Sequence, residues 1–522
     1  MLLDPGGFLS ASIIVFDGAN CIGGNKIYVE FDGSGAFFDF GTNYKKIANF
    51  YEEFLSPRPA RGIHDLLYMG MIPKISCYRH DILPGDVDLS SALNLKVDAV
   101  FLSHAHLDHA GNAGLLDTNI PVVASPVTAA ILKAMEDCGS AGMESEVAYA
   151  APRKVSEEDA RIIETAHYRK APYIGREFLI AGECNGDLKN YWCTCPQSRE
   201  LQHKEIKPAE DELDFEFKSF ELDHSIYGAT AYAINTSAGW IVYTGDLRSH
   251  GRFRDKTERF VKEAGSLDPE VLIIEGTRIG RQEKEESEEE VYKTCLGAAL
   301  DEKDLIIADF SPRNFERLDT FMGIAKEAGR KLVVPAKDAY VLDAMKCVDS
   351  RDRMPDLLIY KDLKARRDAY EKQIHEDFTE QLLDPEDIAK APESYLLCFS
   401  FWGMKHLLDI KPVRGTYIYS SSEAYNEEQV IDFRRLWNWL QFFNFKVRGF
   451  KMVEKEGKEL PEFEKGYHAS GHASAGELLR IVREIDPGIV LPVHTEHPEF
   501  FVENLKEYQV VLAEEGKRIE IN

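Results

Sequence analysis

The stretch Asp98-Ala-Val-Phe-Leu-Ser-His-Ala-His-Leu-Asp-His-Ala-Gly111 is the most informative part of this chain. Its apolar first half predicts a β-strand that ends near Ser103. Three histidines and one aspartate follow this strand within six residues, namely His104, His106, Asp108 and His109. Imidazole and carboxylate groups are the ligands that Zn²⁺ and similar ions prefer. The stretch therefore predicts a metal site at the end of a strand.

One such cluster does not complete two metal sites, so further histidines and aspartates are expected at other strand ends. Three apolar runs end in residues of this kind, namely His224 after 215–222, Asp246 after 240–245 and His494 after 488–493. The carboxylate of Asp246 follows a glycine at a strand end, where it suits a position between two ions. Asp39, in the run Ala36-Phe-Phe-Asp-Phe-Gly41, is expected beside the cluster, where it would orient ligands or solvent.

The composition of the chain limits its class. With 522 residues, 44% of them hydrophobic, the chain is expected to form several domains with a large buried interior. Its formal net charge of −27 excludes a protein that coats nucleic acid or anionic lipid with its whole surface. No apolar run approaches the roughly 20 residues that span a bilayer. Residues 1–7 do not resemble a signal peptide, and the nine scattered cysteines favour a reducing compartment, so we expect a cytoplasmic protein without membrane contact.

The periodicity of the chain predicts an α/β protein. Short strands with glycine turns are expected in residues 11–40, and strands alternate with helices from residue 97 onward, including a helix over 107–116. A second α/β region is expected from about residue 283 to the helix 427–440. The charged, glycine-containing stretch 453–464 is expected to link this region to the rest of the chain.

Taken in order, the motif residues resemble the metallo-β-lactamase fold. Three further motifs resemble its β-CASP nuclease branch, and within it the ribonuclease J group: Glu275 in Val271-Leu-Ile-Ile-Glu-Gly-Thr277, His472 in His468-Ala-Ser-Gly-His-Ala-Ser474, and His494 in Pro492-Val-His-Thr-Glu496. The resemblance implies an αββα sandwich with an inserted α/β domain. It divides the chain into a first sandwich segment at 1–284, a β-CASP domain at 285–450 and a returning sandwich segment at 451–522.

The resemblance also implies a site with two divalent ions, for which Zn²⁺ is preferred to Mn²⁺. The first ion would be bound by His104, His106 and His224, and the second by Asp108, His109 and His494, with Asp246 between them. His472, held in position by Glu275, is the expected acid for the leaving 3′ oxygen. The catalytic residues are accordingly expected to be Asp39, Asp108, Glu275 and His472.

The activity that the resemblance implies is hydrolysis of phosphodiester bonds in single-stranded RNA. It implies a 5′-to-3′ exonuclease with a further endonuclease activity. RNA is preferred to DNA because β-CASP enzymes that act on RNA usually carry histidine at the position of His494. Loops at strand ends are expected to hold substrate phosphates through His468, Ser470, Ser474, Ser311, Arg313 and Ser421. Whether the protein forms a homodimer is left open.

Two other functions fit parts of this pattern. A hydrolase of small esters, thioesters or lactams would use the first metal ligands, but it has no need for Glu275, His472 or a large inserted domain. A non-catalytic RNA-binding subunit ranks last, because every expected ligand is present. In the long stretch 168–218, a zinc site and unrelated reduced thiols are both open readings of Cys184, Cys193, Cys195 and His203, and the irregular spacing favours thiols.

Overall fold

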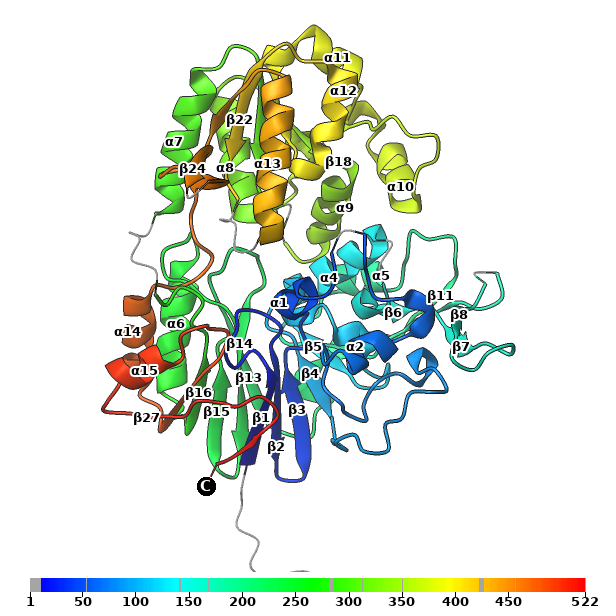
Figure 1. The fold of residues 1–522 in the computed structure, drawn as a ribbon, viewed down its shortest axis with the longest axis vertical. Coiled ribbons are helices and arrows are strands. Elements are labelled where there is room, and N and C mark those ends of the chain that lie inside the picture. The colour runs from blue at the N-terminus through cyan, green and yellow to red at the C-terminus, as the bar shows by residue number, and fades with distance from the viewer. Residues whose placement is uncertain are drawn as a thin grey trace, which may run out of the picture.

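The computed structural model describes residues 11–52, 54–139, 142–167, 169–280, 286–311, 313–349, 351–421, 427–455 and 457–521. The predictions for residues 1–7 and for the domain boundary at residue 284 lie outside these ranges. The molecule has two lobes, one above the other in the view of Figure 1. Within the described residues, no helix combines the length and the apolar character needed to cross a membrane.

Two facing sheets form the centre of the lower lobe. The first has eight strands in the spatial order β12 (Lys207–Pro208), β10 (Phe178–Ile180), β5 (Val122–Ala124), β4 (Ala99–Phe101), β3 (Ser34–Phe38), β2 (Lys26–Phe31), β1 (Ala11–Asp17) and β28 (Arg518–Ile521). The second has six strands in the order β13 (Phe217–Glu221), β14 (Thr230–Thr236), β15 (Gly239–Tyr243), β16 (Val271–Ile274), β26 (Ile489–Pro492) and β27 (Gln509–Val510).

Apolar side chains fill the space between these two sheets. Phe38 and Phe101 from the first sheet pack with Tyr232, Tyr243 and Ile273 from the second. Each sheet also has an outer apolar face, because alternate residues of a strand point to opposite sides. The helices of this lobe are α1 (Tyr44–Ala48), α2 (His64–Tyr68), α3 (Leu107–Ala110), α4 (Pro126–Cys138), α5 (Gly186–Trp192), α6 (Arg254–Gly265), α14 (Ala475–Ile485) and α15 (Glu499–Asn504). α4 covers the first sheet, and α6 and α14 cover the second.

The upper lobe is built on a separate sheet of seven parallel strands. Their order is β20 (Leu382–Leu383), β19 (Leu357–Tyr360), β18 (Lys331–Pro335), β21 (Tyr395–Cys398), β17 (Leu305–Asp309), β22 (Gly415–Tyr419) and β23 (Phe445–Arg448). Its helices are α7 (Glu288–Leu300), α8 (Phe315–Glu327), α9 (Ala336–Ala344), α10 (Ala369–Asp377), α11 (Pro385–Lys390), α12 (Leu407–Ile410) and α13 (Glu427–Phe442). The expected fold class, an αββα sandwich with a further α/β unit, is confirmed. The exact limits of that unit at 285 and 450 stay a prediction.

Two local predictions differ from the structure. The helix expected over 107–116 ends at Ala110, because the chain packs closely at Gly111, where an added Cβ would lie 2.4 Å from the Leu107 carbonyl oxygen. The charged stretch 453–464 belongs to an antiparallel hairpin of β24 (Phe450–Lys455) and β25 (Lys458–Phe463), not to an irregular link. The smaller strands are β6 (Tyr149–Ala150), β7 (Arg153–Val155), β8 (Ile163–Thr165), β9 (Tyr173–Gly175) and β11 (Leu201–Gln202).

The two lobes meet at the carboxyl ends of the upper strands. Arg313, which follows β17, extends to the lower lobe and donates a hydrogen bond to the carbonyl oxygen of Ala105 at 3.4 Å. Ser420, which follows β22, donates from its hydroxyl to the Tyr467 carbonyl oxygen at 2.7 Å. Ligands of open α/β sheets bind outside the carboxyl ends of their strands. The upper sheet therefore presents its binding edge to the loop that contains His104 and His106.

Candidate metal centre

Strand ends of the two lower sheets bring the predicted ligands together. His104 and His106 follow β4, Asp108 and His109 lie on α3, His224 follows β13, Asp246 follows β15, and His494 follows β26. Four overlapping groups of three can each hold one ion: His104–His106–His224, His104–His109–Asp246, Asp108–His109–His494 and His224–Asp246–His472. Within each group the ligand atoms all lie within 4.8 Å of one another. The structure thus brings together all seven predicted metal ligands.

Asp246 lies at the middle of the cluster. Its Oδ2 atom is 3.1 Å from His109 Nε2, 3.8 Å from His104 Nε2 and 3.9 Å from His224 Nε2. Its other oxygen, Oδ1, is 3.9 Å from Nδ1 of His494. This carboxylate therefore reaches both predicted ligand sets, as a group between two ions must.

Most of the imidazoles are held by one nitrogen, so that the other points into the cluster. The Nδ1 atoms of His104, His109 and His494 contact Ser103 Oγ at 3.0 Å, Asp39 Oδ2 at 2.7 Å and Asn25 Oδ1 at 3.1 Å. The Nδ1 atom of His224 contacts the Gly471 carbonyl oxygen at 2.5 Å. Such outer partners fix the ring orientation and the tautomer of a metal-binding histidine.

Asp39 is the most heavily used of these outer partners. It is fully buried and accepts hydrogen bonds from the Ser103 backbone at 2.7 Å, the Ser103 hydroxyl at 2.8 Å and the Tyr243 hydroxyl at 2.6 Å, besides its contact with His109. It adopts the left-handed backbone conformation with φ of +57°, as does His494 with φ of +52°. Non-glycine residues adopt this conformation at a cost, so the surrounding structure must hold both residues in place.

The pKa values of the histidines depend on burial and on the nearby carboxylates. Burial, followed by the neighbouring imidazoles, lowers the pKa of His104 well below its ordinary value, and it lowers the pKa of His224 to about 4. Burial acts in the same direction on His109, but the carboxylates of Asp246, Asp108 and Asp39 together raise its pKa well above the ordinary value. Neutral imidazoles with free lone pairs are the state that binds metal.

The residues present fit divalent cations. His109 Nε2, His494 Nε2 and Asp246 Oδ1 are buried and have no hydrogen-bond partner among the described residues. Buried polar atoms are nearly always paired, because an unpaired one costs about 1–3 kcal/mol. Since all three belong to one cluster of nitrogen and oxygen donors, metal ions are the partners that account for them.

A second pair of residues adjoins this cluster. His472 Nδ1 lies 3.0 Å from Glu275 Oε2 and 3.8 Å from Asp246 Oδ2. The Glu275 carboxylate is fixed by the backbone N–H groups of Leu247 at 2.8 Å and Thr277 at 3.2 Å. Although burial acts to lower it, the carboxylates of Glu275 and Asp246 raise the pKa of His472. His472 is thus able to hold a proton beside the predicted metal ions.

The residues expected to hold phosphates are only partly free to do so. The Ser474 hydroxyl caps α14, and both ring nitrogens of His468 contact carbonyl oxygens, of Ser421 at 2.9 Å and of Gly449 at 2.7 Å. The Ser470 hydroxyl accepts the His472 N–H at 3.1 Å. Arg313 is the member of the set that reaches across to the metal-binding loop, so it is the strongest remaining phosphate contact.

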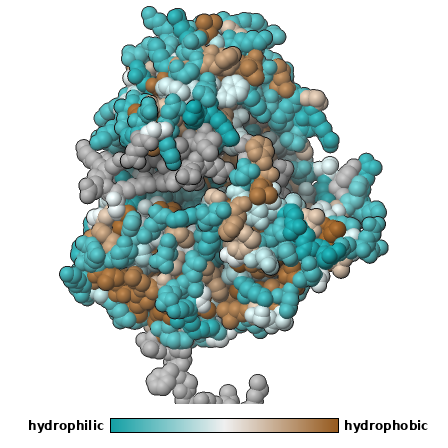
Figure 2. Space-filling view, viewed as in Figure 1, coloured by the Kyte–Doolittle hydropathy of each residue, from teal (hydrophilic) through white to brown (hydrophobic). Residues whose placement is uncertain are grey.

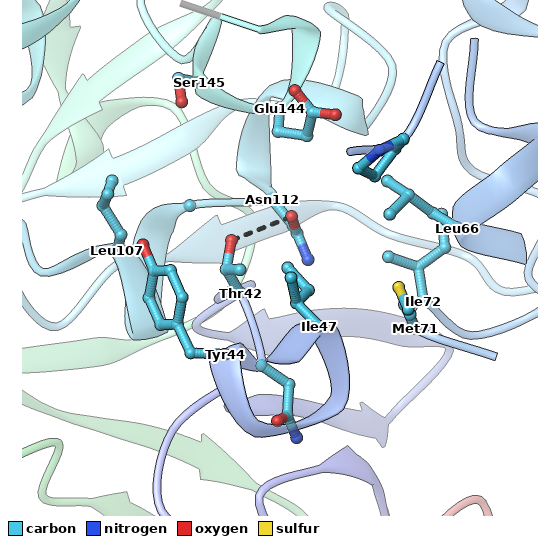
Figure 3. Close-up of a pocket in the computed structure, with 13 residues that line it drawn as sticks. Thr42, Tyr44, Ile47, Leu66, Met71, Ile72, Leu107, Asn112, Glu144 and Ser145 are labelled. Carbon is cyan, nitrogen blue, oxygen red and sulfur yellow. Dashed lines mark hydrogen bonds between the residues drawn. The ribbon is translucent and has the colours of Figure 1, made fainter. Parts of the chain in front are cut away.

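The insertion and the nearest cavity also bear on the predictions. Cys184, Cys193, Cys195 and His203 are all described residues, and no three of them bring ligand atoms within 4.8 Å of one another. A cavity of about 220 Å³ lies beside α3, on the same helix that carries Asp108. In Figure 3, Tyr44 and Leu107 lie at one side of this cavity and Leu66, Met71 and Ile72 at the other.

Sequence reasoning missed several supporting residues. Asn25 contacts His494 and donates to the Tyr243 hydroxyl at 2.9 Å, which links the outer partners of His494 and His109. Arg248, which is fully buried two residues after Asp246, was not singled out either. Its place directly after a predicted ligand is the one signal by which the sequence indicates it.

Comparisons with known proteins place this site in a family context. Residues 84–164 match the model described as Metallo-beta-lactamase superfamily, and residues 462–520 match the model described as Zn-dependent metallo-hydrolase RNA specificity domain. The chain is 23% identical to "Ribonuclease J" of Pyrococcus abyssi (strain GE5 / Orsay), over 97% of this chain and 93% of that protein. It also has the fold of "Crystal Structure of a Protein of Unknown Function from Enterococcus faecalis V583", with a TM-score of 0.67 and 22% identity over 98% of this chain and 100% of that one.

These findings confirm the predicted resemblance to the β-CASP, ribonuclease J-like branch of the metallo-β-lactamase fold. The two matched segments contain both ends of the site. Residues 84–164 include the stretch from His104 to His109, and residues 462–520 include His472 and His494. The chain is therefore a metallo-hydrolase, and this family implies divalent metal ions.

The close approach of Gly41 to α3 gives a first prediction. A Cβ at residue 41 would lie 1.7 Å from the Asp108 carbonyl oxygen, a backbone atom that cannot move without displacing Asp108 and His109. We expect Gly41→Ala to lower the free energy of unfolding by about 1–3 kcal/mol and to reduce bound metal. Thermal unfolding and metal analysis test this. Gly297→Ala is the control, since its Cβ would meet nothing within 4 Å; equal effects of the two changes would contradict the prediction.

The contacts of Asp39 give a second prediction. In Asp39→Asn, an N–H₂ group replaces one of the oxygens that accept from Ser103, His109 and Tyr243, so the His109 ring loses its fixed orientation. We expect zinc affinity to fall by about 10–100-fold, measured by competition with a chromogenic chelator. Asp268→Asn is the matched control, because Asp268 has the same left-handed backbone but is exposed. Unchanged affinity in Asp39→Asn would show that Asp39 does not support the ligands.

Proposed function

Because the chain resembles the ribonuclease J group along almost its whole length, we propose that it is a metal-dependent ribonuclease. It hydrolyses phosphodiester bonds of single-stranded RNA from the 5′ end, and it also cleaves internally. One observation carries the proposal: the Glu275–His472 pair lies directly against a cluster that fits two metal ions. A hydrolase of small activated esters needs the cluster but not this pair.

The site provides the groups that phosphodiester hydrolysis requires. Divalent ions held by the two ligand sets would neutralise charge on the phosphate and promote ionisation of water. Glu275 contacts Nδ1 of His472, so Nε2 is the nitrogen that can donate a proton to the leaving 3′ oxygen. Asp246 keeps the ligand sets adjacent, and Asp39 orients His109. The native ions are proposed to be Zn²⁺, with Mn²⁺ as the substitute.

RNA is the proposed substrate on two grounds. The segment at 462–520, which contains His472 and His494, matches a model whose description names RNA specificity. The second ground is His494 itself, since RNA-cleaving β-CASP enzymes usually carry histidine there. The cavity beside α3 adds a place for an unpaired base, because the half-exposed ring of Tyr44 lines it and unpaired bases stack on aromatic side chains.

The upper lobe supports recognition of the 5′ end. Arg313 crosses from the carboxyl edge of the upper sheet to the Ala105 carbonyl oxygen, and Ser311 and Ser421 lie at the ends of neighbouring strands. Guanidinium and hydroxyl groups at such an edge suit a terminal phosphate. A site that holds the 5′ phosphate beside the metal ions would favour removal of nucleotides one at a time.

The strong acidity of the chain does not oppose RNA binding. Figure 2 shows a largely hydrophilic face with separate hydrophobic patches, so acidic groups are free to spread over the outer surface. The positive charge that faces the substrate is local, in the metal ions and in Arg313. We therefore propose that RNA enters between the lobes and does not spread over the surface.

The central test compares RNA with a small thioester. The purified protein is expected to degrade single-stranded RNA with Zn²⁺ or Mn²⁺, and a chelator should abolish the activity. His472→Ala should keep both ions, by metal analysis, but lose about 100-fold or more of the rate, since general acid catalysis contributes roughly that much. Rapid hydrolysis of a generic thioester without cleavage of RNA would contradict the proposal. Loss of metal in His472→Ala would mean that His472 is a ligand.

End-labelled RNA tests the direction of cleavage. We expect RNA with a 5′ monophosphate to be degraded faster than RNA with a 5′ hydroxyl or triphosphate, and Arg313→Ala to remove most of this difference. Arg351→Ala is the control, because Arg351 is a half-exposed arginine paired with Asp319 away from the strand ends. Equal rates for the three 5′ ends, with internal fragments, would indicate an endonuclease.

A further inference from the structure

We propose that Arg248 is a positioning residue that couples the seating of the upper lobe to the alignment of His472. The inference rests on the proposed ribonuclease reaction, in which His472 donates the proton. It concerns a residue outside the predicted ligand and acid set. Arg248 touches neither the predicted ions nor the Glu275–His472 pair, but it contacts the loop that carries His472 and the helix that begins the upper lobe's contact with it.

The guanidinium of Arg248 is fully buried and is bonded on three sides. Its Nε donates to Asp223 Oδ1 at 3.2 Å, Nη1 to the Ser470 carbonyl oxygen at 3.0 Å, and Nη2 to Glu316 Oε2 at 2.6 Å. These three partners belong to the His224 loop, the His472 loop and helix α8 of the upper lobe. A planar group with five donors suits this arrangement, and a lysine, with one nitrogen, does not reproduce it.

The loop 470–472 is short and is held at each residue. Ser470 accepts from Arg248, and its hydroxyl accepts the His472 N–H. The Gly471 carbonyl oxygen contacts His224 Nδ1, and the His472 ring contacts Glu275. Moving the Ser470 carbonyl therefore shifts the backbone two residues before the proton donor.

On the other side, the contact with Glu316 belongs to a buried chain of charges in the upper lobe. Arg317, the next residue, donates to Glu288 Oε1 at 2.9 Å and to the carbonyl oxygen of Ser420. Arg317 and the Ser420 hydroxyl both donate to the Tyr467 carbonyl oxygen, at 3.4 and 2.7 Å. The upper lobe is thus bonded to the segment 467–470 at two points, and Arg248 is the point next to His472.

This geometry makes the position of His472 depend on where the upper lobe sits. If α8 moves away, Glu316 leaves Arg248, whose guanidinium then has only Asp223 and Ser470 as close partners. A displacement of about 1 Å at a reacting group is enough to cost about 100-fold in rate. The alignment of the acid is accordingly coupled to a lobe that contributes no metal ligand.

The test compares two RNA substrates that differ in one atom. One has the natural 3′ oxygen at the scissile bond, and the other has sulfur there. Hydrolysis breaks the bond from phosphorus to this atom, and an oxygen leaving group takes up a proton from His472. A thiol ionises near pH 8.5, so sulfur leaves as the thiolate and takes no proton. A residue that acts through the acid therefore affects the oxygen substrate more than the sulfur substrate.

We expect Arg248→Lys to lower kcat on the oxygen substrate by about tenfold or more and on the sulfur substrate by less than about threefold, with KM and metal content unchanged. Gly251→Ala should show the same pattern without removing a charge, because its Cβ would lie 2.4 Å from Arg248 Nε. Should Arg248→Lys fail to fold, Glu316→Gln removes only the contact with the upper lobe and carries the same expectation.

Arg176→Lys is the matched control, since Arg176 is an equally buried arginine that bonds only backbone carbonyls of Leu116, Asp117 and Gly114. Its effect should be the same on both substrates. If His472→Ala prefers the sulfur substrate and Arg248→Lys does not, the coupling is overturned and the ribonuclease proposal stands. If His472→Ala itself affects both substrates equally, the acid assignment fails and the role of Arg248 fails with it.

Discussion

The structure depends on one electrostatic constraint. Five imidazoles and two carboxylates are packed around a single buried point, where the protein supplies too few hydrogen-bond donors for the lone pairs that meet there. His109 Nε2, His494 Nε2 and Asp246 Oδ1 remain without partners among the described residues. Such a cluster is stable only if cations occupy its centre, since a buried carboxylate without compensation costs far more than any single contact returns. The strained backbone at Asp39 and His494 and the close packing of Gly41 follow from holding these groups in place.

Much of the site was predictable because each ligand directly follows an apolar strand. A strand that ends in His, Asp or a close pair of them shows both its position and its chemistry in a few residues, as with His104, Asp246 and His494. The outer partners are different. Asn25 and Tyr243 meet across 218 residues of sequence, and no local pattern marks either of them. The short α3 and the hairpin 450–463 were missed for a related reason, since tertiary packing overrides local propensity there.

The phosphate-binding residues show where resemblance reaches its limit. Ser474 and His468 stand in the right motif, but in this structure one caps a helix and the other bridges two carbonyl oxygens. Arg313 and Arg248 act across the joint between lobes and depend on how the upper sheet is seated. Arginine is suited to both places, because it presents several donors in a fixed plane. The inserted lobe is thus part of the active site by position, although it supplies no metal ligand.

The most direct test of the account is anomalous X-ray scattering from crystals of the protein loaded with Zn²⁺ or Mn²⁺. We expect two anomalous peaks about 3.5–4 Å apart. One should lie among His104, His106 and His224, and the other among Asp108, His109 and His494, with Asp246 between them. A single peak, or none within this cluster in metal-loaded protein, would contradict the two-ion centre and the mechanism built on it.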